Sequence, residues 1–152
     1  MKISIDIGSI SEKKGKVFGN VYFHENSFFF PEKGWNDFLV IVLNWWCHAT
    51  KKLISNESIH EDFSFMDGPF QVRIGYFKDG FFNLTFKSNE DVLRIVEVPI
   101  SSFLNDFLGE INMVLRHFHH LKWNDKETEE LNKNYKEIKL LLKNHQADNV
   151  VK

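Results

Sequence analysis

Three histidines that lie close together in the chain are the residues best suited to metal or acid-base chemistry. His117, His119 and His120 fall in a segment whose apolar spacing is typical of a helix, and on a helix only His117 and His120 share a side. A zinc site would need further ligands with a spacing such as Cys-x-x-Cys or His-Glu-x-x-His, and the sequence contains neither. We therefore expect solvated histidines, no metal site and no cofactor.

Other catalytic arrangements have little support in the sequence. Glu110 lies two turns before His117 on the same side of the predicted helix, so an acid-base pair would need a further group from another element. The chain has no P-loop, no Gly-x-Gly-x-x-Gly run and no Gly-x-Ser-x-Gly turn. Cys47 is the only cysteine, and its place beside Trp46 in a predicted helix favours a buried core residue in a reducing compartment over a nucleophile.

The element that must position the rest of the chain is the segment 36–55, which we predict to be a central helix. Asn36 or Asp37 is expected to cap its start. Its apolar residues cover roughly 220° of the helix, much more than a surface helix buries. We therefore expect a helix buried on two sides, with Trp45 and Trp46 in the core. A narrow polar strip, either functional or merely solvated, contains Asn44, His48 and Lys51.

Strands are predicted wherever apolar and polar residues alternate. These ranges are 2–7, 16–24, 27–30, 70–76, 82–86 and 92–98. Residues 8–15 are predicted as a polar turn, and the pair of strands on either side of Lys78-Asp79-Gly80 is the clearest hairpin. Because the connections between strands are short, we expect mostly antiparallel pairing.

Two further helices are predicted in the last third of the chain. Ser102 is expected to cap a helix that ends near Leu121 and keeps its apolar residues within an arc of about 140°, so it packs through one face only. The final helix is expected to start near Asn124, which forms a signal resembling a capping box with Glu127. Residues after about His145 are expected to be frayed.

Length and element order predict the fold class. A chain of 152 residues suits one domain that buries roughly two-thirds of its extended surface. The predicted order βββ-α-βββ-α-α keeps strands and helices apart in the sequence, which is typical of α+β folds. We therefore predict a single two-layer α+β domain over residues 1–152, with a mostly antiparallel sheet covered by helices.

Charge and hydropathy exclude two classes of partner. Lysine and arginine number 19 against 21 acidic residues, so the sequence carries no electrostatic signal for nucleic acid or anionic lipid. Asn44 interrupts the apolar run of the central helix well before the roughly 20 residues that a membrane span needs.

Asp6 and Glu12 lie where a signal peptide would be apolar, so we expect a cytoplasmic protein.

One run of residues resembles a group of small uncharacterised bacterial proteins. The similarity rests on Phe30-Pro31-Glu32-x-Gly34-Trp35-Asn36-Asp37-Phe38, on Leu43-x-Trp45-Trp46 and on Phe65-Met66-Asp67-Gly68-Pro69. Some members of that group are thought to be immunity proteins that neutralise toxins of neighbouring cells. The resemblance implies a binding role, and it implies no particular site residues.

We therefore predict a non-enzymatic protein-binding module, with a bacterial toxin as its partner. The expected contact surface is the polar side of the second predicted helix, where Met113 lies among charged and imidazole side chains. These residues are Asp106, Glu110, Met113, Arg116, His117 and His120. The alternative is a small hydrolase-like enzyme whose site combines Glu110 and His117 with Asn44 and His48. A homodimer is expected if the later helices leave the apolar arc of the central helix uncovered.

Overall fold

The computed structural model describes residues 1–151, and it describes side chains through Asn144. The strands are β1 (Lys2–Lys13), β2 (Lys16–Glu25), β3 (Phe28–Phe30), β4 (Asn36–Phe38), β5 (His60–Ser64), β6 (Phe70–Lys78), β7 (Phe81–Ser88) and β8 (Asp91–Pro99). The helices are α1 (Leu39–Ile54), α2 (Ile100–His120) and α3 (Lys126–Val151). The predicted fraying after His145 concerns side chains outside the described set.

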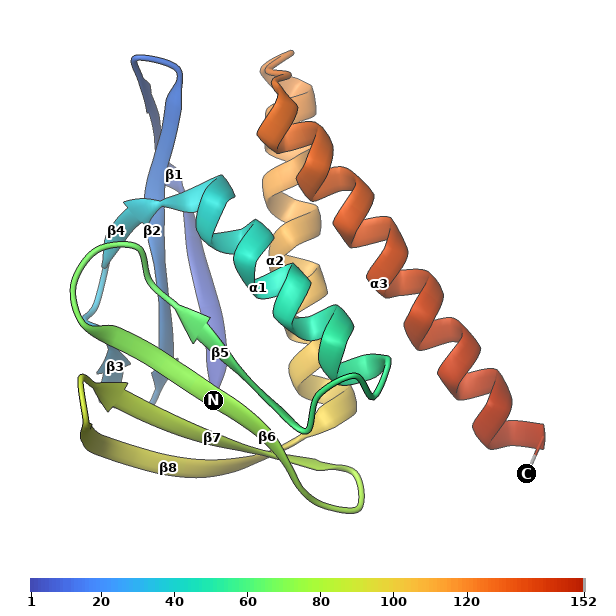
Figure 1. Cartoon of the computed structure of the whole chain (residues 1–152). Coiled ribbons are helices and arrows are strands. Elements are labelled where there is room, and N and C mark those ends of the chain that lie inside the picture. Colours follow the sequence, from blue (N-terminus) through green and yellow to red (C-terminus); the bar gives the residue numbers. More distant parts are fainter. Residues whose placement is uncertain (152) are drawn as a thin grey trace.

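The strands form two four-stranded antiparallel sheets, and the predicted α+β class with antiparallel pairing is confirmed. Sheet A contains β1, β2 and β3, with β4 also paired to β2, and sheet B runs β5-β6-β7-β8. The strands divide into two sheets because the chain leaves sheet A through α1 before it begins sheet B. Figure 1 shows the helices together on one side of the sheets, with α3 outermost. Two short strands, β4 and β5, were not predicted. β4 directly precedes α1, and β5 follows the loop after α1.

The predicted turn at residues 8–15 is wrong, because β1 continues through it to Lys13. The pairing of β1 with β2 shifts register between Asp6 and Ser11. At this irregularity the Gly8 N–H donates to Asp6 Oδ1 and the Ser9 hydroxyl donates to the Asp6 carbonyl. These local bonds replace ladder bonds, so a polar stretch remains extended. The chain reverses only at Lys14 and Gly15, both of which have positive φ.

The start of α1 also differs from the prediction. Asp37 does not cap the helix, since it lies in β4, where it pairs with Gly19 of β2. Its buried carboxylate accepts hydrogen bonds from Trp35 Nε1 at 3.0 Å, from the Phe38 N–H at 2.8 Å and from the Met66 N–H at 3.2 Å. Asp37 therefore ties β4 to the loop after β5, and the helix begins at Leu39 without a side-chain cap.

Trp46 lies at the centre of the core. Its ring stacks on Phe63 at a centroid distance of 5.0 Å and meets Phe65 edge-on at 5.2 Å, and its Nε1 donates to the Ser64 carbonyl at 2.9 Å. The prediction that Trp45 is also a core residue is wrong, since its side chain is 44% exposed. Adjacent helical positions diverge by about 100°, so the two tryptophans point in different directions.

The wide apolar arc predicted for α1 is largely buried. Both sheets and the other helices pack against it, and Trp45 is a part of the predicted arc that stays exposed, so the surface that we considered for a dimer is mostly covered. The buried apolar residues are Leu39, Val40, Val42, Leu43, Trp46, Cys47, Ala49 and Leu53.

The predicted caps of the other two helices are wrong, since α2 has no side-chain cap and the cap of α3 lies one residue later. Helix α2 begins at Ile100, directly after the extended Pro99, and the Ser102 hydroxyl donates to the Pro99 carbonyl at 3.3 Å rather than capping the helix. Helix α3 is capped by Asp125, whose Oδ1 accepts the Thr128 N–H at 2.8 Å. Asn124 instead donates its amide to Glu129 Oε1. Helix α2 buries most of its predicted apolar face, with Leu121 exposed at its end, and α3 buries Leu131 and Ile138.

Candidate functional site

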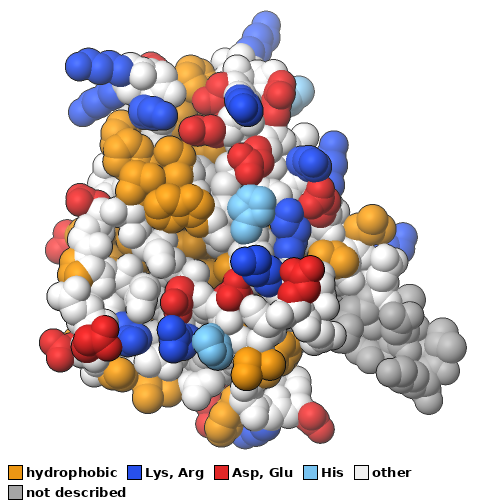
Figure 2. All heavy atoms as spheres, in the orientation of Figure 1, with side chains coloured by type: hydrophobic (Ala, Val, Ile, Leu, Met, Phe, Trp, Pro, Cys, Tyr) orange, Lys and Arg blue, Asp and Glu red, His pale blue; other side chains and the backbone are white. Residues whose placement is uncertain are grey.

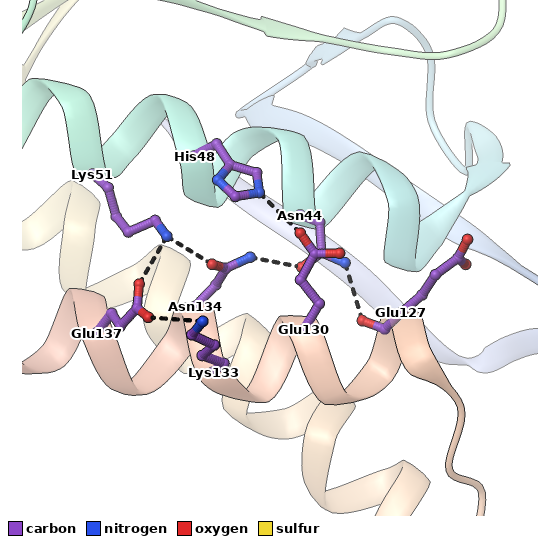
Figure 3. Close-up of polar contacts among 8 residues, drawn as sticks. All are labelled: Asn44, His48, Lys51, Glu127, Glu130, Lys133, Asn134 and Glu137. Atoms are coloured by element: carbon purple, nitrogen blue, oxygen red, sulfur yellow. Dashed lines mark hydrogen bonds and ion pairs between the residues drawn. The ribbon is translucent and has the colours of Figure 1, made fainter.

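The polar strip of α1 is the contact surface for α3. Figure 3 shows the side chains of Asn44, His48 and Lys51 pointing toward α3. The Asn134 amide donates to Asn44 Oδ1 at 3.0 Å, and the Asn44 amide donates to the Glu127 carbonyl at 3.1 Å. Lys51 Nζ donates to Asn134 Oδ1 at 2.8 Å and lies 2.9 Å from Glu137. We call this set the polar seam, and its geometry fixes the position of α3 along α1.

At its exposed margin the seam contains two further polar contacts. His48 Nε2 lies 3.0 Å from Glu130 Oε1, with both side chains about half exposed. Lys133 Nζ lies 3.9 Å from Glu137 Oε1, one turn further along α3. Hydrogen bonds to Lys51 lower the pKa of Glu137 below its usual range. Since each described member of the seam has a partner in the chain, the seam serves to join helices.

The predicted binding surface on α2 is divided between two environments. Glu110 faces β1, the edge strand of sheet A, and its carboxylate accepts the Ile5 N–H at 3.1 Å. Burial raises the pKa of the Glu110 carboxyl, and the bond from Ile5 opposes that effect. Asp106, Met113 and His117 follow the same side of the helix by their spacing, and Met113 is 38% exposed.

Arg116 and His120 lie instead on a groove between the C-terminal half of α2 and the N-terminal half of α3. The groove has a volume of about 740 Å³. Leu115, Phe118 and Tyr135 form its apolar wall. Its polar lining includes Arg116, His119, His120, Lys122 and Glu129. The structure thus brings Arg116 and His120 together with His119 and Lys122, which we had not placed in the predicted surface.

The enzymatic alternative required Glu110 and His117 to meet Asn44 and His48. The structure ties Glu110 to β1, whereas Asn44 and His48 are bonded to α3. Among the described residues, no group of three or more His, Cys, Asp or Glu side chains is arranged to hold a metal ion. Burial raises the pKa of the Cys47 thiol to about 12, which keeps it protonated and unreactive at neutral pH.

A cluster of apolar side chains on the surface is the feature that sequence reasoning missed. Figure 2 shows hydrophobic side chains gathered over the start of α1 and the adjacent end of sheet A. Phe18 and Phe38 are cross-strand partners whose ring centroids lie 4.5 Å apart, and both are only partly buried. Ile41 and Trp45 follow Phe38 by three and seven positions, which places them in one row along α1. We call these four residues the aromatic patch.

Basic residues border the aromatic patch. Lys13, Lys14 and Lys16 are exposed at the tip of the β1–β2 hairpin, and Figure 2 shows Lys and Arg side chains beside the hydrophobic cluster there. The one ion pair of this tip among the described residues joins Lys16 to Glu127 at 3.9 Å. A sequence signal for the patch did exist, because Ile41 is the apolar residue that interrupts the polar strip, and Trp45 is its neighbour at i+4.

Comparisons with protein families, with curated proteins and with solved structures found no match for this chain. None of the described helices is both long enough and apolar enough to cross a membrane.

Proposed function

We propose that this protein is a non-enzymatic protein-binding module whose contact surface is the aromatic patch. The observation that carries the proposal is Trp45, a large aromatic side chain that is 44% exposed in a row with partly exposed Ile41 and Phe38. Aromatic residues dominate the energetics of protein interfaces, because they bury much area at low cost in side-chain entropy. The folded core already contains Trp46, so the fold does not require Trp45 at this position.

The charge around the patch favours a partner with an acidic surface. Lys13 and Lys14 add positive charge beside the patch in a chain whose formal net charge is −2, whereas Lys16 is paired with Glu127. Oppositely charged rims speed association and help to select the partner. The resemblance to suspected immunity proteins favours a toxin as this partner, held in an inactive complex by contact with the patch.

The experiment is co-expression with the product of the adjacent gene, followed by measurement of the affinity of the purified pair. Cells that carry both genes are expected to grow, and cells that carry the neighbour alone are expected to stop. Trp45→Ala should weaken the complex by about thirtyfold or more, as hot-spot aromatics do. Ile59→Ala is the matched control, because Ile59 is 77% exposed and lies outside the patch.

A third variant compares the patch with the α2 surface that the sequence predicted. Replacing Met113 and His117 together by Ala should leave the affinity unchanged if the aromatic patch is the contact surface. If this double variant loses binding while Trp45→Ala keeps it, the partner docks on α2. If co-expression gives no protection and the purified proteins do not associate, the immunity function is wrong.

A further inference from the structure

The groove between α2 and α3 has an apolar floor whose side chains remain partly exposed. Leu115, Trp123 and Tyr135 line it, and each is only partly buried. Along both helices the lining residues are three or four positions apart, so each helix presents one stripe to the groove. The stripe on α2 is Asn112, Leu115, Arg116 and His119, and the stripe on α3 is Thr128, Asn132 and Tyr135.

The turn between the helices, residues 121–125, holds these two stripes in place, and we call it the elbow. The Trp123 N–H donates to the Phe118 carbonyl at 2.9 Å, and Lys122 lies in the left-handed region at a φ of 56°, as in the Schellman arrangement of a helix end. Asp125 then caps α3 by accepting the Thr128 N–H. The groove is therefore formed before a ligand arrives, which lowers the ordering cost of binding.

The positive side chains of the groove all come from α2 and the elbow. Arg116 and Lys122 are exposed, and neither has a carboxylate within 4.0 Å among the described residues. The exposed His119 belongs to the same wall. On the α3 wall the acidic Glu129 accepts a hydrogen bond from the Asn124 amide. The α2 wall of the groove therefore favours acidic groups, in a chain whose formal net charge is −2.

The length of the walls indicates the shape of the ligand. The stripes from Asn112 to His119 and from Thr128 to Tyr135 each cover seven residue steps, which is about 11 Å or two helical turns. An amphipathic helix that lies in a hydrophobic groove is anchored by apolar side chains at positions i, i+3 or i+4, and i+7, which cover the same length. Two walls of this length with an apolar floor between them suit such a helix.

We propose that the groove docks an amphipathic helix of a partner protein, with the acidic flank of that helix against α2. The apolar side chains of the docked helix pack on Leu115, Trp123 and Tyr135, and its carboxylates pair with Arg116 and Lys122.

This site is separate from the aromatic patch. Helix α3 turns Glu130 and Asn134 toward α1 and turns Asn132 and Tyr135 toward the groove, so α3 lies between the groove and α1. The proposal therefore does not depend on the function proposed for the patch.

The test uses the full-length protein and a synthetic peptide of about 12 residues, or roughly three helical turns. The peptide is held helical by a hydrocarbon staple, carries Leu along one face and Glu on one flank, and is labelled with fluorescein. Fluorescence anisotropy is expected to show binding in the micromolar range. In a ¹⁵N-labelled sample the shifted backbone amides should lie within residues 112–135. One control peptide has Lys in place of each Glu, and a second has the same composition in an order that breaks the apolar face.

Variants of the protein test the two parts of the contact. Arg116→Glu should raise the dissociation constant of the acidic peptide about tenfold or more and should lower that of the Lys peptide. Lys136→Glu makes the same change of charge at an exposed position of α3 outside the groove, so it should leave both constants unchanged. Asn132→Trp fills the groove from an exposed position and should abolish binding while the protein melts near the parent temperature.

The proposal is overturned if the acidic peptide does not bind at millimolar concentration, if either control peptide binds equally well, or if the shifted amides lie outside residues 112–135. A self-association of the protein that Asn132→Trp abolishes would assign the groove to a second copy instead. Binding to phosphatidylglycerol vesicles that Arg116→Glu abolishes would assign it to a lipid surface. Either of these results would also overturn the proposal.

Discussion

At the scale of single residues, the clearest lesson concerns two adjacent tryptophans with opposite roles. Trp46 is fully buried against Phe63 and Phe65, and Trp45 is 44% exposed. The sequence predicted one role for both, because a wide apolar arc on a helix does not reveal which part of it the rest of the chain will cover. Apolar periodicity identifies candidates for burial, and only the tertiary arrangement selects among them.

The two tryptophans should therefore differ in their effect on stability. Trp46→Ala is expected to lower the free energy of unfolding by about 3 to 5 kcal/mol, through lost burial and the cavity that remains. Trp45→Ala should cost about 1 kcal/mol or less, because much of the ring is already in water. Urea unfolding of the two variants checks this difference. Equal losses would mean that Trp45 is a core residue after all.

Glu110 has a stability effect that depends on pH. Burial raises the pKa of its carboxyl in the folded protein. The stability that this group contributes is therefore complete below the unfolded-state pKa of about 4.3 and is lost as the pH rises through the higher folded value. Glu110→Gln keeps an acceptor for the Ile5 N–H and does not ionise. Its stability relative to the parent should thus increase between pH 4 and pH 7, as measured by thermal melts.

Glu110→Ala is the comparison that isolates the hydrogen bond. Relative to Glu110→Gln it should cost about 1 kcal/mol at every pH in this range, because neither variant ionises and the N–H of an edge strand loses its partner. A constant difference between parent and Glu110→Gln from pH 4 to pH 7 would show that the carboxyl titrates normally.

At the scale of elements, the hairpin β6–β7, the apolar face of α2 and the existence of α1 could be predicted from periodicity alone. The short strands β4 and β5 could not, because three to five residues carry too little pattern. The caps were displaced because Asp37, Ser102 and Asn124 find other partners in space. The sequence left the role of the polar strip on α1 open. Asn44 and Lys51 are suited both to solvent and to a polar contact with another helix, so their residue types alone do not predict the contact with α3.

The polar seam predicts a strong coupling between Asn44 and Asn134. Asn134→Ala should lower the free energy of unfolding by about 2 kcal/mol, because Asn44 and Lys51 keep their polar atoms and lose a partner. Changing both asparagines to Leu should cost less than the sum of the two single changes. Lys136→Ala is the control, since its side chain is exposed on the same helix and lies outside the seam. Additive effects in a double-mutant cycle would contradict the seam as a connected network.

At the scale of the whole molecule, the outer edge of sheet B is a strand that exposes three large apolar side chains. In the described chain no strand pairs with the free side of β8. Its side chains Val92, Leu93 and Ile95 are 53%, 54% and 58% exposed. The edge strand β1 of sheet A is partly covered, because the Glu110 carboxylate accepts the Ile5 N–H of that strand. An apolar unpaired edge invites pairing with another strand.

We therefore predict a homodimer through β8 rather than through α1. Antiparallel pairing of β8 with its own copy has twofold symmetry, so the same residues contribute from both chains. Light scattering at micromolar concentration should give a mass above 18.0 kDa that rises with concentration. Ile95→Lys should return the monomer mass, and Leu140→Lys, which replaces an equally exposed leucine on α3, should not. A mass of 18.0 kDa at all concentrations would exclude this dimer.

The polar seam also has a consequence for how the molecule opens. Helix α3 packs on the rest of the molecule largely through amide hydrogen bonds and ion pairs, and few of its described apolar residues are fully buried. The two sheets instead pack against the buried Trp46. Units with little apolar burial open at lower free energy than the core. The backbone amides of α3 should therefore exchange with deuterium by a partial opening that leaves the sheets protected. Since α3 forms one wall of the groove, any ligand that fills the groove must slow this exchange in proportion to its occupancy.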